Sequence, residues 1–134
     1  MVSMNNLGIL LVDDDTAFRN DIAKYLKARG CMNVRTASSG EVALELIKSE
    51  VPKLVLLDLY LPQMNGLKAL REILKIDSNI AVFMLTCEED EEYRHLAAKL
   101  GAFDYLTKPI TLETLYSYLD LRIKGRLKTT QSAP

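Results

Sequence analysis

Three consecutive carboxylates, Asp13, Asp14 and Asp15, directly follow an apolar run at residues 7–12. Like charges a few ångström apart repel one another, and each raises the pKa of its neighbours when nothing offsets it. The acidic cluster at a strand end therefore predicts a cation, a proton or a lysine close by.

Three further polar residues stand at or just past the ends of later apolar runs: Asp58, Thr86 and Lys108. In a parallel sheet the carboxyl ends of the strands meet at one edge, so these side chains are expected to converge with Asp13 and Asp14. Each residue alone has a simple alternative role in a cap or a turn. All five together favour a single functional site.

The residue types restrict the chemistry of such a site. Carboxylates without a neighbouring histidine or thiolate suit a hard cation with oxygen ligands, which indicates Mg2+ and disfavours zinc. Mg2+ neutralises phosphoryl oxygens, while the Thr86 hydroxyl can donate a hydrogen bond to them and Lys108 can pair their remaining charge. One carboxylate is then available as the nucleophile of a phosphoryl transfer.

The elements that would position these residues alternate along the chain. Apolar runs predict strands near residues 7–12, 33–37, 53–57, 80–85 and 103–106. Helical patterns lie between and after them, which is typical of an α/β fold with helices on both faces of a parallel sheet. Five such units predict a doubly wound sheet.

The predicted helices carry end signals. We expect the first to end at Gly30, the third to begin after Asn65 and the last to be capped by Thr111. The acidic run 88–92 is expected to open the fourth helix, where carboxylates interact favourably with the helix dipole. Helical spacing predicts that the fourth helix turns these side chains inward: Tyr93, Leu96, Ala97 and Leu100.

Composition indicates one ordinary globular domain. The chain has 134 residues, 49% of them hydrophobic and 26% charged, with a formal net charge of -1 that suggests no particular partner. It contains no apolar run of about 20 residues, as a membrane span would need, and its first residues lack signal-peptide features. A cytoplasmic protein without a membrane partner is expected.

Cysteine and histidine offer little chemistry. Cys31 and Cys87 have no metal-ligand spacing, and we expect both to be small buried thiols. His95 is expected at the surface or its boundary. Residues 123–134 alternate basic with other residues and end in a polar stretch, which we interpret as a frayed, solvated tail or the start of a linker and not as a nucleic-acid contact.

Several stretches together resemble the receiver domains of two-component response regulators. They are residues 9–15, residues 56–59 with Pro62 and Gly66, residues 84–86 and residues 104–109. The resemblance covers about residues 5–122, in the order and at the spacing usual for that family. It implies a flavodoxin-like or CheY-like α/β fold, with a five-stranded parallel sheet in the order 2-1-3-4-5 and five helices.

The resemblance also implies roles for individual residues. Asp58 would accept a phosphoryl group from a phosphohistidine of a sensor histidine kinase or a phosphotransfer protein. Mg2+ would be held by Asp13, Asp14 and Asp58 with the backbone carbonyl of Tyr60. Such a protein is a phospho-accepting switch and not a separate enzyme.

The same resemblance implies how the switch would work. Thr86 and Lys108 would grip the phosphoryl oxygens, Thr86 would move toward the phosphate, and Tyr105 would turn inward. The face built by the fourth helix, fifth strand and fifth helix would then change for an output domain or downstream protein, and the family also allows a homodimer. A cis peptide is implied between Lys108 and Pro109.

Three residues near the site depart from or vary the family pattern. Cys87 stands where a smaller residue is usual and would crowd the path of Thr86. Tyr60 and Glu88 occupy positions that in this family tune the loss of phosphate. We hypothesise that the Tyr60 ring shields the acyl phosphate from water, the alternative being a plain solvent-facing loop residue.

Other classes of protein remain open at this point. In a phosphatase of the haloacid dehalogenase type, Asp13 would be the nucleophile and Asp15 the acid, but only Glu113 and Asp120 follow Lys108 as further acidic ligands. A flavin or nucleotide binder would place phosphate beside three repelling aspartates. An interaction module without phosphorylation is the third alternative. The chain is either a stand-alone protein or part of a longer regulator.

Overall fold

In this computed structural model the described residues are 3–132, with side chains described through residue 125. Five parallel strands form one sheet in the order β2-β1-β3-β4-β5. Their bounds are β1 (Gly8–Val12), β2 (Asn33–Ala37), β3 (Leu54–Leu57), β4 (Ala81–Thr86) and β5 (Asp104–Thr107). The predicted α/β fold and strand order are confirmed.

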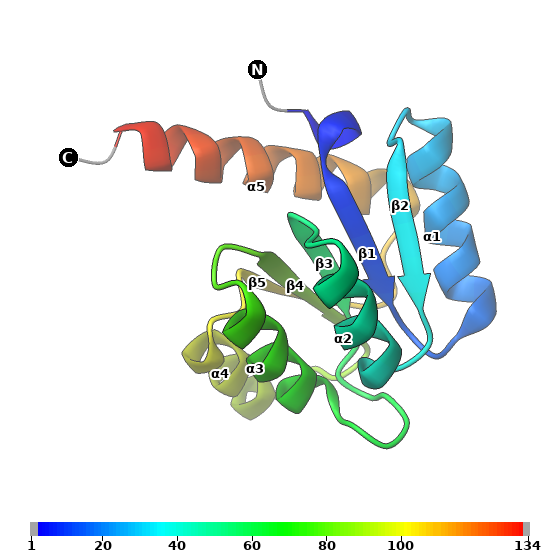
Figure 1. Ribbon diagram of the computed structural model, residues 1–134, viewed down its shortest axis with the longest axis vertical. Helices are drawn as coiled ribbons and strands as arrows, with labels where there is room; N and C mark the ends of the chain where they lie inside the picture. The colour runs from blue at the N-terminus through cyan, green and yellow to red at the C-terminus, as the bar shows by residue number, and fades with distance from the viewer. Residues whose placement is uncertain (1–2, 133–134) are drawn as a thin grey trace.

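A helix follows each strand: α1 (Thr16–Ala28), α2 (Gly40–Ser49), α3 (Gly66–Ile76), α4 (Glu91–Leu100) and α5 (Leu112–Ser132), with a short 3-10 helix η1 (Met4–Asn6) before β1. Helices α1 and α5 cover one face of the sheet and α2, α3 and α4 the other, as Figure 1 shows. Every residue of β3 and β4 is buried because both strands lie between the two helical layers.

The register of the strands determines which polar residues meet. Val12 at the end of β1 is paired with Leu57 at the end of β3, so Asp13 and Asp58 leave neighbouring strands at the same level. Thr86 is paired with Thr107 at the ends of β4 and β5, and Lys108 is the next residue.

Polar side chains set the starts of the helices. The residues before α1, α2, α3 and α4 each accept a hydrogen bond from a backbone N–H of the first turn: Asp15, Ser39, Asn65 and Asp90. Thr111 accepts from the Thr114 N–H before α5, at 3.1 Å, as predicted. Gly30 follows the C-terminal cap of α1 with a φ of 101°, which confirms the predicted end of that helix.

Three predictions on the fourth unit were wrong. Helix α4 begins at Glu91 and not at Glu88, because the Asp90 carboxylate caps the Glu92 N–H at 2.9 Å and leaves Glu88 in the preceding loop. Leu96 is 39% exposed because α4 rests on the sheet through the small Ala97. Cys87 is exposed because the chain leaves the sheet after Thr86, whereas Cys31 is buried as predicted.

The predicted frayed tail at residues 123–134 can be compared with the structure only in part. Helix α5 continues through Ser132, while the side chains of residues 126–132 and the whole of residues 133–134 lie outside the described residues. In the described part of the chain, none of the helices combines the length and apolar character that crossing a membrane requires.

Candidate functional site

The buried polar or charged side chains of the described residues all lie at one end of the sheet. They are Asp13, Asp58 and Thr86, with 6%, 7% and 0% of their surfaces exposed. Burying a carboxylate is costly unless it is paired or binds a cation. The structure therefore concentrates this cost at the predicted site.

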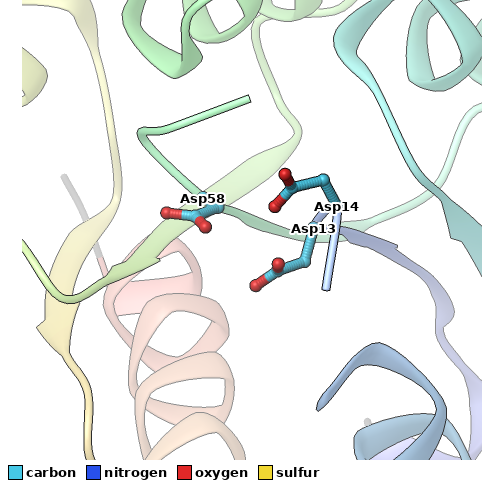
Figure 2. A group of neighbouring side chains, drawn as sticks. All are labelled: Asp13, Asp14 and Asp58. Atoms are coloured by element: carbon cyan, nitrogen blue, oxygen red, sulfur yellow. The ribbon is translucent and has the colours of Figure 1, made fainter. Parts of the chain in front are cut away.

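Three carboxylates come together there. Figure 2 shows Asp13, Asp14 and Asp58 extending to the same side of the strand ends, and one oxygen from each lies within 4.8 Å of the others. Asp13 and Asp58 are buried while Asp14 is exposed at the rim. The predicted acidic cluster is thus present, with an all-oxygen donor set that suits Mg2+.

The third aspartate of the run has a different position. The Asp15 carboxylate accepts the Phe18 N–H at 3.1 Å and caps α1. Its backbone N–H donates to Asp13 Oδ1 at 2.9 Å, which orients that carboxylate. Asp15 is therefore occupied as a helix cap, and this geometry disfavours the acid role that a phosphatase of the haloacid dehalogenase type would require.

Lys108 is the cation that the acidic cluster predicted. Its Nζ lies 2.7 Å from Asp13 Oδ2 and 3.5 Å from Asp58 Oδ2. Burial works to lower the pKa of Lys108, but the two carboxylates outweigh it and raise that pKa above its usual value. The lysine backbone is held as well, because its N–H donates to the Thr86 carbonyl at 2.8 Å. The peptide bond between Lys108 and Pro109 is cis, as expected.

The surroundings of Asp58 shift the pKa of its carboxyl group. Burial, and next the charge of Asp13, raise the pKa of Asp58 above its usual value. Lys108 acts in the opposite direction, as do hydrogen bonds from the Tyr60 N–H and the Thr86 hydroxyl. The Tyr60 N–H lies 3.3 Å from Asp58 Oδ1. Asp58 is therefore a buried carboxylate that has hydrogen-bond donors and a lysine around it and two further carboxylates beside it.

Tyr105 is buried behind the site. Its hydroxyl donates to the Glu88 carbonyl at 2.9 Å, and burial raises the pKa of the phenol. The Arg94 guanidinium lies 4.7 Å from the ring centroid and donates to the Tyr105 carbonyl at 2.9 Å. The ring that the family resemblance expects to turn inward is thus already inward in this structure.

Glu88 connects the residues around the rim. Its backbone N–H donates to the Thr86 hydroxyl at 3.3 Å, and its carboxylate accepts a hydrogen bond from the Tyr60 hydroxyl. That bond raises the pKa of Tyr60 to about 12 and lowers the pKa of Glu88. The loop after β3 and the loop after β4 are therefore tied together beside Asp58.

Two contacts near the site were not predicted from the sequence. Arg19 donates to the Asp13 carbonyl at 2.7 Å, and the Lys108 ammonium lies 4.3 Å from the centroid of the Phe18 ring. The sequence signal for both contacts was that Phe18 and Arg19 fall in the first turn of α1, directly after the Asp15 cap. This turn lies beside the carboxyl ends of β1 and β3.

Comparison with known proteins identifies the class. The sequence model of the response regulator receiver domain matches residues 9–120. The chain is 40% identical over 124 residues to the transcriptional regulatory protein CpxR homolog of Haemophilus influenzae, which covers 92% of this chain and 52% of that protein. It spans about half, or less, of the length of the curated relatives it matches.

Solved structures agree with this assignment. A CheY-like response regulator receiver domain protein from Methanospirillum hungatei superposes with a TM-score of 0.84 at 28% identity, covering 90% of this chain and 95% of that one. The BeF3-activated DrrB receiver domain superposes with a TM-score of 0.77 at 28% identity, covering 88% and 97%.

The five-stranded parallel sheet with an acidic pocket at its carboxyl edge defines an α/β domain of the CheY-like type. This chain belongs to the receiver domain family of response regulators in two-component systems. Members of that family are phospho-accepting switches, and the pocket formed by Asp13, Asp14 and Asp58 is the corresponding feature here.

Proposed function

We propose that this chain is a signalling switch in which Asp58 accepts a phosphoryl group from a phosphohistidine of a sensor histidine kinase or a phosphotransfer protein. One observation carries the proposal. Asp58 is a buried carboxylate that lies beside two further carboxylates, with the Lys108 ammonium 3.5 Å from one of its oxygens. Its nucleophilic oxygen and the charges that would stabilise a phosphoryl group therefore share one pocket.

The donor set fits Mg2+. Asp13, Asp14 and Asp58 would hold the ion together with the backbone carbonyl of Tyr60, since Mg2+ takes oxygen ligands and usually keeps several waters. A bound Mg2+ would supply positive charge that offsets both the carboxylates and the phosphoryl oxygens.

The residues of this chain supply the rest of the chemistry. A bond forms between a carboxylate oxygen of Asp58 and phosphorus, while the phosphorus–nitrogen bond to the histidine breaks and its electron pair stays on the imidazole. Lys108 pairs the charge of the transferred group, and the Thr86 hydroxyl donates a hydrogen bond to one of its oxygens. The product is an acyl phosphate on Asp58.

The new charge would bias a two-state element. A phosphoryl group shifts an equilibrium only by interacting differently with the two states, and Thr86 and Lys108 are the residues that can make that difference. Thr86 is joined to Tyr105 through Glu88, so movement of Thr86 would change how often Tyr105 stays buried. The face of α4, β5 and α5 would carry the change to a partner.

The partner at that face would be an output domain, a downstream protein or a second copy of the chain. No direct nucleic-acid contact is proposed for this chain. The receiver unit is proposed to occupy residues 5–122, followed by a tail or linker start at residues 123–134. We place its action in the cytoplasm, as is typical of receiver domains.

Tyr60 and Glu88 are proposed to tune the lifetime of the phosphate. The Tyr60 side chain is 50% exposed, and its hydroxyl is fixed on Glu88. We propose that this bond holds the ring close enough to Asp58 to hinder the approach of water to the acyl phosphate.

Intact-mass spectrometry after incubation with acetyl phosphate tests the proposal. Wild type should gain one phosphoryl mass in the presence of Mg2+ and none after chelation, and Asp58→Asn should gain none. Asp15→Asn is the matched control, because it removes a neighbouring carboxylate yet keeps a good helix cap, and it should be phosphorylated like wild type. Wild type that gains no mass under any condition would instead support an interaction module without phosphorylation.

A further inference from the structure

The Lys108 ammonium has a third neighbour besides its two carboxylates. Its Nζ lies 4.3 Å from the centroid of the Phe18 ring, which is the distance of a cation–π contact. The Lys108 side chain is 19% exposed, so water does not fully screen this contact. The ammonium therefore lies between an acidic pocket and an aromatic ring.

The local sequence explains why this ring reaches the pocket. Asp15 caps α1 through the Phe18 N–H, which makes Phe18 the third residue of the helix. Helical side chains lean back toward the N-terminus of their helix, and the N-terminus of α1 lies at the strand ends that carry Asp13 and Asp58. Phe18 also lines a small cavity that includes both aspartates.

The ring differs from the carboxylates in one respect that matters for phosphoryl transfer. When the charge of Asp13 and Asp58 is offset by a cation, their attraction for Lys108 weakens, and a lysine has a flexible stem that then loses its fixed position. The Phe18 ring carries no net charge, so its attraction for the ammonium does not depend on whether the carboxylate charges are offset. Its contact with the ammonium persists while the ion pairs change.

We propose that Phe18 is a positioning residue for Lys108, holding the ammonium beside Asp58 through a cation–π contact while the phosphoryl group is received. This role rests on the proposed function of Asp58. The competing explanation is that Phe18 fills space between α1 and the sheet, since the ring is half-buried among apolar residues.

Two substitutions separate these explanations. Phe18→Leu keeps an apolar side chain in the cavity but has no π face, whereas Phe18→Tyr keeps the π face. Phe103→Leu is the matched control, because Phe103 also lies beneath a cation, the Arg122 guanidinium at 4.8 Å, but does not line the acidic pocket. Thermal melting checks that each variant is folded.

The first readout is the rate of phosphorylation by acetyl phosphate as a function of Mg2+ concentration. Phe18→Leu should lower the maximal rate about tenfold, leaving the half-saturating Mg2+ concentration unchanged, because the Phe18 ring offers no ligand atom to the ion. Phe18→Tyr and Phe103→Leu should remain close to wild type. A wild-type rate in Phe18→Leu, or an equal loss in a folded Phe18→Tyr, would overturn the positioning role.

The second readout does not depend on phosphorylation. In NMR spectra without Mg2+, the Lys108 methylene protons next to the ammonium should be shifted upfield by the ring in wild type and in Phe18→Tyr. They should return to ordinary positions in Phe18→Leu, and unshifted signals in wild type would overturn the contact. If wild type shows these shifts but takes up no phosphate, the proposed function fails and the positioning role fails with it, while the contact itself stands.

Discussion

The Tyr60 hydroxyl donates a hydrogen bond to the Glu88 carboxylate, and this bond joins the loop after β3 to the loop after β4. Glu88 also accepts the Tyr105 hydroxyl on its carbonyl and donates its N–H to Thr86. Glu88 thus contacts three residues with proposed roles. Tyr60 would shield the phosphate, Thr86 would bind it, and Tyr105 would change position in response to it. Phosphate lifetime and switching are therefore expected to be linked.

Removing the Tyr60 ring should shorten the life of the acyl phosphate. We expect Tyr60→Ala to lose phosphate several-fold faster, and Tyr60→Phe to lie between Tyr60→Ala and wild type because it keeps the ring but not its bond to Glu88. The decay is followed by mass spectrometry after the phosphodonor has been removed. Equal decay in wild type and Tyr60→Ala would show that Tyr60 is only a solvent-facing loop residue.

Gly66 should be indispensable for the geometry around Asp58. A Cβ at this position would lie 2.3 Å from the Asp58 carbonyl oxygen, a backbone atom that cannot easily move. Gly66→Ala is expected to cost about 2 kcal/mol or more in unfolding free energy, measured by denaturant titration. In Gly125→Ala, the control, the new methyl meets nothing within 4 Å, so the substitution should be neutral or stabilising by up to about 1 kcal/mol. A fully stable Gly66→Ala would contradict the close approach.

Tyr118 should contribute a pH-dependent part of the stability. Its hydroxyl donates to Asp104, and that bond, with burial, raises the pKa of Tyr118. Folding then favours the neutral phenol, so the contribution is complete below pH of about 10 and is lost as pH rises through the raised folded value. At neutral pH Tyr118→Phe should lower stability by about 1 kcal/mol.

Melting temperatures of wild type and Tyr118→Phe, measured across pH, test the predicted direction of this pH dependence. The difference in melting temperature between wild type and Tyr118→Phe should stay constant below pH of about 10 and shrink as the pH rises from about 10 through the raised folded pKa. A difference that stays constant or grows above pH of about 10 would show that the hydrogen bond does not hold the phenol neutral.

The two cysteines should react at very different rates. Cys87 is exposed, whereas Cys31 is buried and its pKa is raised by burial, which disfavours the reactive thiolate. A disulfide reagent should therefore modify one thiol quickly in the native protein, and Cys87→Ser should abolish that fast phase while denaturation exposes the second thiol. Rapid modification of Cys87→Ser in its native state would contradict the burial of Cys31.

Much of the fold could be predicted because the information is local. Strand-length apolar runs ending in Asp13, Asp58 and Thr86 identify central parallel strands, and the geometry of a parallel sheet then places their ends at one edge. The position of Lys108 at this edge was predicted in the same way, because it follows the fifth strand. Its ion pair with Asp13 supplies the positive charge that the acidic run predicted.

Other features depend on contacts that no local pattern contains. Aspartate is the preferred helix cap within the acidic run 88–92, which favours Asp90, but only the path of the loop after β4 brings the Glu88 carboxylate to the Tyr60 hydroxyl. The periodicity of α4 marks Leu96 as apolar but cannot show that the helix rests on the sheet through Ala97. The contact between Phe18 and Lys108 joins residues from opposite ends of the chain.

The most direct test of the central claim is to map the phosphorylated residue. The protein is phosphorylated with acetyl phosphate and Mg2+, and borohydride then reduces the acyl phosphate, converting the modified aspartate to homoserine before peptides are sequenced by mass spectrometry. The account predicts homoserine at position 58 and at no other aspartate. Homoserine at Asp13 or Asp14, with an unmodified Asp58, would contradict it.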